Sequence, residues 1–277
     1  PSRIGPLRIG PLRIGSLTIP TPVVLAPMAG ITNPAYRQLC LEQGAGLYVC
    51  EMITSRGIVE RNPKTHAMLR FAPGESVRSV QLYGVDPDVM ADAARILARD
   101  YAVDHIDLNF GCPAKTVNKS RGGAVLLKEP ELLNQIVEHV RRAVPAHIPV
   151  TAKMRLGFDS PDGALVCATA LAEGGAAELV VHARTKLEGY RPPAHWPWIA
   201  RIRQVVDINV VANGEIWSLD DALACRQASG SADIMIGRGL VACPDLAWQI
   251  ACQVASPTFR LMPRSARIST WRSASST

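Results

Sequence analysis

Short apolar runs of four to six residues recur along the chain from residue 23, each rich in strand-forming residues. The segments between most of them are long enough for helices, and this alternation is typical of βα units with a parallel sheet. Eight runs predict β-strands, at Val23–Met28, Leu47–Met52, Ser79–Gly84, His105–Asn109, Val150–Arg155, Leu179–Ala183, Asn209–Ala212 and Asp233–Ile236.

Helical patterns lie between the runs, with starts marked by Pro, Asp or Ser. They cover Pro87–Asp100, Pro130–Val144, Gly163–Glu173, Pro197–Val206 and Leu219–Ser229. Eight strands within about 215 residues predict a (β/α)₈ TIM barrel of eight parallel strands, for which roughly 250 residues is usual. The alternative is a doubly wound open sheet, but its GxGxxG fingerprint does not follow the first strand.

The two ends of the chain differ from the barrel pattern. A pentad repeats as RIGPL at 3–7, RIGPL at 8–12 and RIGSL at 13–17. Its prolines argue against a regular helix or central strand, so we expect residues 1–16 to form an irregular or extended arm. Residues 255–277 are rich in Ser, Thr, Arg and Pro, which predicts a disordered basic tail. The barrel domain is expected at 17–254.

The formal net charge of +6 comes from these two ends. They hold seven arginines and no acidic residue, so the remainder carries 23 basic and 24 acidic residues, a net charge of −1. The global charge is therefore no argument for nucleic-acid binding, and any RNA contact on the body needs a local patch.

Seven scattered cysteines without a CxxC pair favour neither a zinc site nor a disulfide framework, so no metal is expected. No apolar stretch approaches the roughly 18–20 residues of a membrane span, and the start lacks a signal-peptide layout. These features predict a cytoplasmic protein.

Chemistry in a barrel gathers at the carboxyl ends of the strands. Gly237-Arg238-Gly239 follows the last run and Asn213-Gly214 follows the run before it, at the position where barrels commonly bind phosphate. For either turn alone, the simpler interpretation is that glycine only permits a tight turn between strand and helix. Both together, with an arginine, indicate the phosphate of a flavin mononucleotide.

Two further side chains belong to neighbouring strand ends. Strand alternation puts Lys153 and Arg155 on the same side of the sheet, and a lysine inside a barrel implies an anionic ligand or a carboxylate partner. We expect Lys153 to face the N1–C2=O edge of a flavin, the alternative being a salt bridge with Glu51 or Asp107. His182 is either a satisfied core histidine or a donor to the flavin.

Cys112 stands between Gly and Pro in the loop after the fourth strand, which is a poor place for core packing. A free thiol is mostly protonated at neutral pH and can act as a general acid. As a nucleophile it would instead need a neighbouring base.

These residues belong to segments that resemble the tRNA-dihydrouridine synthases, in the right order and spacing over about residues 15–250. The segments are LAPMAGITNPAYR at 25–37, VQLYG at 80–84, DLNFGCPAKTV at 107–117, AKMRLG at 152–157, VVHART at 180–185, ANGEI at 212–216 and MIGRG at 235–239. Residues 184–191 and 213–217 look like the bacterial subgroup that modifies uridine 16.

The resemblance implies an FMN enzyme that uses NADPH to reduce a flipped-out uridine of tRNA, with Cys112 as the proton donor. It implies that uridine is held by Asn109, Lys115 and Arg184. It implies FMN contacts from Pro27, Met28, Ala29, Gln81, Lys153, His182, Asn213, Gly214, Glu215, Gly237 and Arg238.

Family members normally continue into a helical domain that cradles tRNA, and the composition of residues 251–277 is unlike it. We therefore expect that domain to be missing or altered, and the protein to be a monomer. Two alternatives stay open: an FMN barrel oxidoreductase acting on a small pyrimidine, and a synthase fragment impaired in catalysis.

Overall fold

The computed structural model describes residues 11–255, and seven of its parallel strands correspond to seven of the predicted runs. Their order in the sheet follows the chain, so each strand pairs with its sequence neighbours. These strands are β3 (Val23–Leu25), β6 (Ser79–Tyr83), β7 (His105–Phe110), β8 (Val150–Arg155), β9 (Glu178–His182), β10 (Asn209–Asn213) and β11 (Ile234–Ile236).

The second predicted run forms two short strands, β4 (Leu47–Tyr48) and β5 (Ile53–Thr54), in place of one. β4 pairs with β3, β5 pairs with β6, and a bridge between Val49 and Ser79 lies between them. The run therefore closes the barrel by pairing with both of its neighbours. The predicted (β/α)₈ TIM barrel is confirmed.

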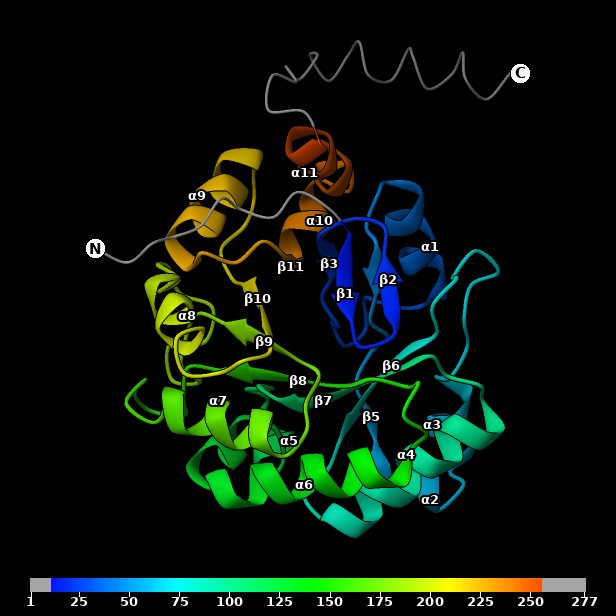
Figure 1. The fold of residues 1–277 in the computed structure, drawn as a ribbon. Helices are drawn as coiled ribbons and strands as arrows, with labels where there is room; N and C mark the ends of the chain where they lie inside the picture. Colours follow the sequence, from blue (N-terminus) through cyan, green and yellow to red (C-terminus); the bar gives the residue numbers. More distant parts are fainter. Residues whose placement is uncertain (1–10, 256–277) are drawn as a thin grey trace.

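Helices cover the outside of the curved sheet (Figure 1). Asp86 caps one of them by accepting from the backbone N–H groups of Asp88 and Val89, and Gly230, at φ +65°, ends another. The helices are α1 (Pro34–Glu42), α2 (Ser55–Val59), α3 (Pro63–Ala67), α4 (Pro87–Asp100), α5 (Lys115–Lys119), η1 (Gly123–Lys128, 3₁₀), α6 (Pro130–Ala143), α7 (Ala164–Glu173), α8 (Pro197–Ile202), α9 (Leu219–Ser229), α10 (Arg238–Ala242) and α11 (Leu246–Ala255).

Alternation along the strands separates two environments. One set of side chains packs against the helices in the main core, including Val80, Ile106 and Val150. The opposite set faces the lumen. It is apolar on β3, β4 and β11, and mixed on β9 and β10, where Val180 and Val211 lie between polar residues such as Glu178 and Asn213; it is polar on the three strands β6–β8. The buried polar lumen residues on those three strands include Ser79, Gln81, His105, Asp107, Asn109, Thr151 and Arg155.

The start of the described chain is a β-hairpin of β1 (Leu12–Ile14) and β2 (Leu17–Ile19), so the irregular or extended arm expected for residues 1–16 is extended at β1, and its residues 1–10 lie outside the described residues. Leu12, Ile14 and Ile19 pack on the apolar half of the lumen. The hairpin lies at the amino-terminal end of the strands, where Ser16 donates to the His147 carbonyl. The predicted tail at 255–277 lies outside the described residues apart from Ala255, which ends α11.

The apolar contacts of the hairpin explain why the strands form. Leu12, Ile14, Leu17 and Ile19 alternate with exposed or half-buried residues, and Gly15 takes the positive φ of +54° that the turn requires. Within residues 11–255, no helix has the length and apolar character needed to span a membrane.

Ile14→Ala should lower the free energy of unfolding by about 2–5 kcal/mol, because it leaves a cavity where a fully buried side chain closes the barrel. The measurement is chemical denaturation. Arg13→Ala, at the exposed neighbouring position, is the matched control and should change stability by about 0.5 kcal/mol or less. Equal effects of the two variants would contradict the packing role of the hairpin.

Candidate functional site

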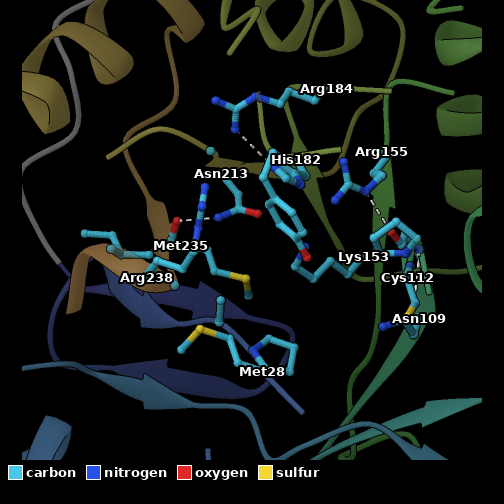
Figure 2. Close-up of a pocket in the computed structure, with 18 of the residues that line it drawn as sticks. Met28, Asn109, Cys112, Lys153, Arg155, His182, Arg184, Asn213, Met235 and Arg238 are labelled. Carbon is cyan, nitrogen blue, oxygen red and sulfur yellow. Dashed lines mark hydrogen bonds between the residues drawn. The ribbon is translucent and has the colours of Figure 1, made fainter. Parts of the chain in front are cut away.

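A cavity of about 570 Å³ opens at the carboxyl ends of the strands. It is lined by fourteen of the fifteen residues that the sequence marked as site residues: Pro27, Met28, Ala29, Gln81, Asn109, Cys112, Lys153, His182, Arg184, Asn213, Gly214, Glu215, Gly237 and Arg238. Lys115 is the exception, since it is exposed at the start of α5 and does not line the cavity. Figure 2 shows Cys112 and Asn109 on one side of the cavity and Asn213 and Arg238 on the opposite side.

Positive charge dominates the lining of the cavity. Lys153, Arg155, Arg184 and Arg238 contribute four cations, and Glu215 is the one carboxylate among the lining residues. Glu215 is already ion-paired with Arg184. The cavity therefore offers an excess of positive charge that fits an anionic ligand.

Lys153 extends into this cavity from β8. Within residues 11–255 its ammonium makes no hydrogen bond or ion pair, so neither the Glu51 nor the Asp107 salt bridge forms. Glu51 instead accepts from the N–H of Gly30 at 2.6 Å. Burial, with a smaller contribution from Arg155, lowers the pKa of Lys153 to about 8.

Arg184 is fully buried and ties together the loops after β9 and β10. Its guanidinium donates to the Arg191 carbonyl at 2.6 Å, pairs with Glu215 and lies 3.3 Å from Nε2 of His182. Glu215 takes a positive φ of +57°, which this ion pair helps to hold. The structure thus gives Arg184 a role in shaping the wall, and its predicted contact with uridine stays a prediction.

His182 ends β9 and is buried against cations. Burial first, and then Arg155, Lys153 and Arg184, hold the pKa of His182 well below its ordinary value, so the imidazole is neutral. Gly214 leaves room for it, because a Cβ at Gly214 would come within 2.8 Å of the His182 ring. His182 and Gly214, both predicted to contact FMN, therefore also contact each other.

Close backbone packing explains the glycines after β11. A Cβ on Gly239 would lie 2.1 Å from the Ile216 carbonyl oxygen, so only glycine fits there. The neighbouring Arg238 is exposed, and its guanidinium lies 4.7 Å from the ring centre of Tyr190 and 4.9 Å from that of Trp217. Among the described residues Arg238 has no ion pair, which leaves its charge available to a ligand.

The backbone N–H groups of the Cys112 loop are held by one side chain. Oδ1 of Asn109 accepts from the N–H groups of Gly111 at 3.1 Å and Cys112 at 2.9 Å. Asn109 is therefore engaged by the protein and does not stand free for a substrate. Its predicted contact with uridine stays untested.

The carbonyl groups of the same loop are also held. Arg155 donates through Nε to the Gly111 carbonyl at 2.8 Å. The Cys112 carbonyl accepts from the N–H of Ala124 at 3.0 Å and from Nδ2 of Asn118 at 2.8 Å. All four backbone polar groups of the two residues are bonded, so the half-buried Cys112 thiol stands on a fixed support.

Sequence reasoning missed several residues that build the site. Asp107, considered from the sequence only as a salt-bridge partner of Lys153, lies with Thr151 below the cavity in the polar half of the lumen, and period-two alternation with Asn109 and Lys153 would have placed both there. The ring centre of Tyr190 lies 5.1 Å from the guanidinium of Arg155 and 4.7 Å from that of Arg238, and no short-range pattern marks this residue.

Comparison with known families identifies the arrangement. The family model described as dihydrouridine synthase (Dus) matches residues 24–267. The chain belongs to this family. The match passes residue 250, at which the resemblance was expected to end, and continues beyond the described residues.

Curated relatives of the dihydrouridine synthase family are similar over most of the chain. A tRNA-dihydrouridine(16) synthase of Pseudomonas putida is 57% identical over 237 residues, which cover 83% of this chain and 73% of that protein. A tRNA-dihydrouridine(16) synthase of Neisseria meningitidis serogroup A is 49% identical over 239 residues, covering 83% and 71%. The likeness to the subgroup that modifies uridine 16 is therefore confirmed.

Solved structures confirm the barrel architecture of this Dus family member. Histamine dehydrogenase from Rhizobium sp. 4-9 superposes with a TM-score of 0.68 at 15% identity, over 90% of this chain and 48% of that chain. An amine oxidase from Pseudomonas geniculata N1 gives 0.67 at 14%, over 90% and 49%. The chain thus spans about half the length of each, and at this identity the likeness concerns the fold.

Lys153→Met should stabilise the ligand-free protein at pH 7, because it removes a half-buried cation that makes no hydrogen bond or ion pair with the described residues. The lysine has a pKa of about 8 when folded and about 10.5 when unfolded, so between these values the unfolded chain binds more protons. Wild-type stability should therefore rise with pH across this window, and the variant should lose that rise.

Thermal unfolding at pH 7 and pH 10 measures both effects, with about 2–4 °C expected per 1 kcal/mol. Lys119→Met, at an exposed position, is the control and should leave the melting temperature nearly unchanged. A lower melting temperature for Lys153→Met at pH 7 would show that the ammonium is stabilised by groups other than a ligand.

Proposed function

We propose that this chain is an FMN-dependent tRNA-dihydrouridine synthase that uses NADPH to reduce the C5=C6 bond of uridine 16 in tRNA. The observation that carries the proposal is the cationic cavity of a dihydrouridine synthase barrel, with a cysteine held at its wall by bonds to all its backbone groups. The relatives named above act on tRNA, as their names state.

The residues present fit FMN. Lys153 and Arg238, two cations without an ion pair to any described residue, face one cavity, and together they match a ring edge that accepts negative charge and a phosphate. Gly237 lines the cavity beside Arg238 and has no side chain that would keep a phosphate from its backbone. Neutral His182, buried beside the cations, suits a hydrogen bond to the ligand better than a fifth positive charge.

Reduction of the uracil double bond requires a hydride and a proton. FMN would supply the hydride when bound. The chain supplies the proton from the thiol of Cys112, and the two additions convert the double bond to a single bond. Water then returns a proton to the sulfur, which restores the thiol for the next turnover.

The RNA contact involves residues around the mouth of the cavity. Lys115 is exposed on α5, which begins three residues after Cys112, so it is placed to meet a phosphate of the nucleotide chain. The target base must leave its stack to reach Cys112, because the thiol is half-buried inside the cavity wall. The cytoplasmic location and monomeric state expected from the sequence belong to the same proposal.

The decisive experiment is mass analysis of dihydrouridine at position 16 of tRNA after incubation with the purified protein, FMN and NADPH. Free uracil compounds form a second arm. Reduction of tRNA supports the proposal. Reduction of free pyrimidines alone supports a small-molecule oxidoreductase, and no reaction from protein that retains FMN supports an impaired fragment.

Arg238→Ala should weaken FMN binding by roughly 10- to 100-fold, since one charge-assisted hydrogen bond to a phosphate contributes about 1.5–3 kcal/mol. Fluorescence titration of the flavin-free protein measures the dissociation constant. Arg201→Ala is the matched control, because Arg201 is also exposed and also lies over an aromatic ring, at 3.9 Å from the ring centre of Trp198. Equal FMN affinity in wild type and Arg238→Ala would place the phosphate elsewhere.

Cys112→Ala should retain FMN and NADPH-driven flavin reduction while dihydrouridine formation falls by roughly 10²- to 10⁴-fold, the usual contribution of a general acid. Stopped-flow absorbance and tRNA mass analysis separate the two half-reactions. Cys252→Ala removes another partly exposed thiol and should behave as wild type. Loss of FMN from the Cys112 variant would assign the thiol to cofactor binding.

A further inference from the structure

The polar half of the lumen contains a continuous line of hydrogen bonds beneath the Cys112 loop. Every side chain in it is buried, and the most exposed, Asn109, is 8% accessible. The upper part runs from Asn109 to Gln81, whose Oε1 accepts from Nδ2 of Asn109 at 2.8 Å, and from Gln81 to Asp107, whose Oδ2 accepts from Nε2 of Gln81 at 2.6 Å.

The lower part of the line continues from Asp107 through Thr151 and His105 to Ser79. Oγ1 of Thr151 donates to Oδ1 of Asp107 at 2.7 Å and lies 2.8 Å from Nε2 of His105. Nδ1 of His105 lies 2.7 Å from the hydroxyl oxygen of Ser79. Burial lowers the pKa of His105 to about 4, so its ring is neutral and donates through Nε2 alone.

The direction of each hydrogen bond in the upper line is dictated by its ends. At the top, the N–H groups of Gly111 and Cys112 can only donate, so Asn109 must present its oxygen to them. At the bottom, burial raises the pKa of Asp107, whereas hydrogen bonds from Thr151, Gln81 and the backbone of Leu108, with the charge of Lys153, favour its carboxylate form. A carboxylate can only accept, so Gln81 presents its NH₂ group to it. With both amides oriented in this way, the middle bond from Asn109 to Gln81 is satisfied as well.

We propose that Asp107 is a positioning residue for Cys112, because its carboxylate orients the Gln81 amide so that the Gln81 oxygen accepts from Asn109, the residue whose own oxygen holds the Cys112 loop. Asp107 does not touch the cavity and takes no part in proton transfer. It acts through the two amides on a thiol whose catalytic role rests on the proposed function.

The charge of Asp107 distinguishes it from a neutral hydrogen-bonding residue. A carboxamide at position 107 can face Gln81 with either its oxygen or its NH₂ group, so the upper line loses its single direction. Hydrogen bonds to charged groups are also stronger than those between neutral groups. The hydrogen bond that Asn109 donates to Gln81, and with it the rigidity of the support of Cys112, therefore depends on a carboxylate two residues away on the same face of β7.

The test is backbone amide hydrogen exchange at Gly111 and Cys112, followed by NMR in the flavin-free protein. Asp107→Asn should accelerate exchange about tenfold, which corresponds to about 1.4 kcal/mol. Thr151→Val removes the other hydrogen bond to the same carboxylate and should change exchange by less than about threefold. A general loss of core stability would instead affect both variants alike.

The double variant Asp107→Asn with Gln81→Glu moves the carboxylate one step along the line. The new carboxylate accepts from Asn109 and from the new amide, which still accepts from Thr151, so protection of the two loop amides should return to within about threefold of wild type. Gln81→Met cuts the line while keeping Asp107 and should match Asp107→Asn, which keeps the test available if that variant does not fold.

Unchanged amide exchange in Asp107→Asn or Gln81→Met, whichever folds, would overturn the proposal. Acceleration of exchange in Thr151→Val equal to that in Asp107→Asn would also overturn it, as would a double variant that does not restore protection. Each outcome is read from the loop amides and needs no turnover. A wild-type protein that leaves tRNA unmodified would refute the proposed function without altering these results.

Discussion

Polar side chains buried inside a barrel must find their hydrogen-bond partners within it, and this constraint organises the functional half of the molecule. A buried polar group without a partner costs roughly 1–3 kcal/mol. On β6–β8 the lumen positions are polar, and most of them are satisfied by one another. The site is therefore continuous with a hydrogen-bonded interior, whereas the other half is closed by apolar packing of the hairpin against Val24, Leu47, Val180, Val211 and Met235.

Lys153 is an exception, because its ammonium finds no hydrogen-bond partner among the described residues of the barrel. This difference separates a residue available to bind a ligand from residues that support the site. Gln81, Asn109 and Arg155 are engaged by protein groups, whereas the Lys153 ammonium faces the cavity with no hydrogen bond or ion pair from the described residues. An unpaired cation in a half-buried position reduces stability, and a charge-accepting ligand would offset that cost. A function that needs affinity for an anion thus accounts for a residue that the fold alone does not favour.

Strand periodicity was sufficient to predict the barrel and the neighbourhood of the site, because parallel strands bring all their carboxyl ends together. It could not reveal partners that come from distant strands. Arg184 and Asn109 resemble free ligand-binding groups in the sequence, yet each is engaged by the protein, through Glu215 and Gln81 among others. The hairpin was missed because prolines in the repeat outweighed the alternation of Leu12 and Ile14. The second run is divided into β4 and β5 because its first part pairs with β3 and its last part with β6, and no local sequence pattern encodes this pairing.

The backbone of the Cys112 loop is fixed by hydrogen bonds from several neighbouring elements. Carbonyls of Gly111 and Cys112 are held from β8 and from the α5–η1 segment, while their N–H groups are held from β7 itself. Gly123, at φ +66°, brings that segment so close that a Cβ there would meet the Cys112 carbonyl oxygen at 2.7 Å. Three elements therefore fix one dipeptide, and the thiol direction is set by the barrel rather than by the flexibility of a loop.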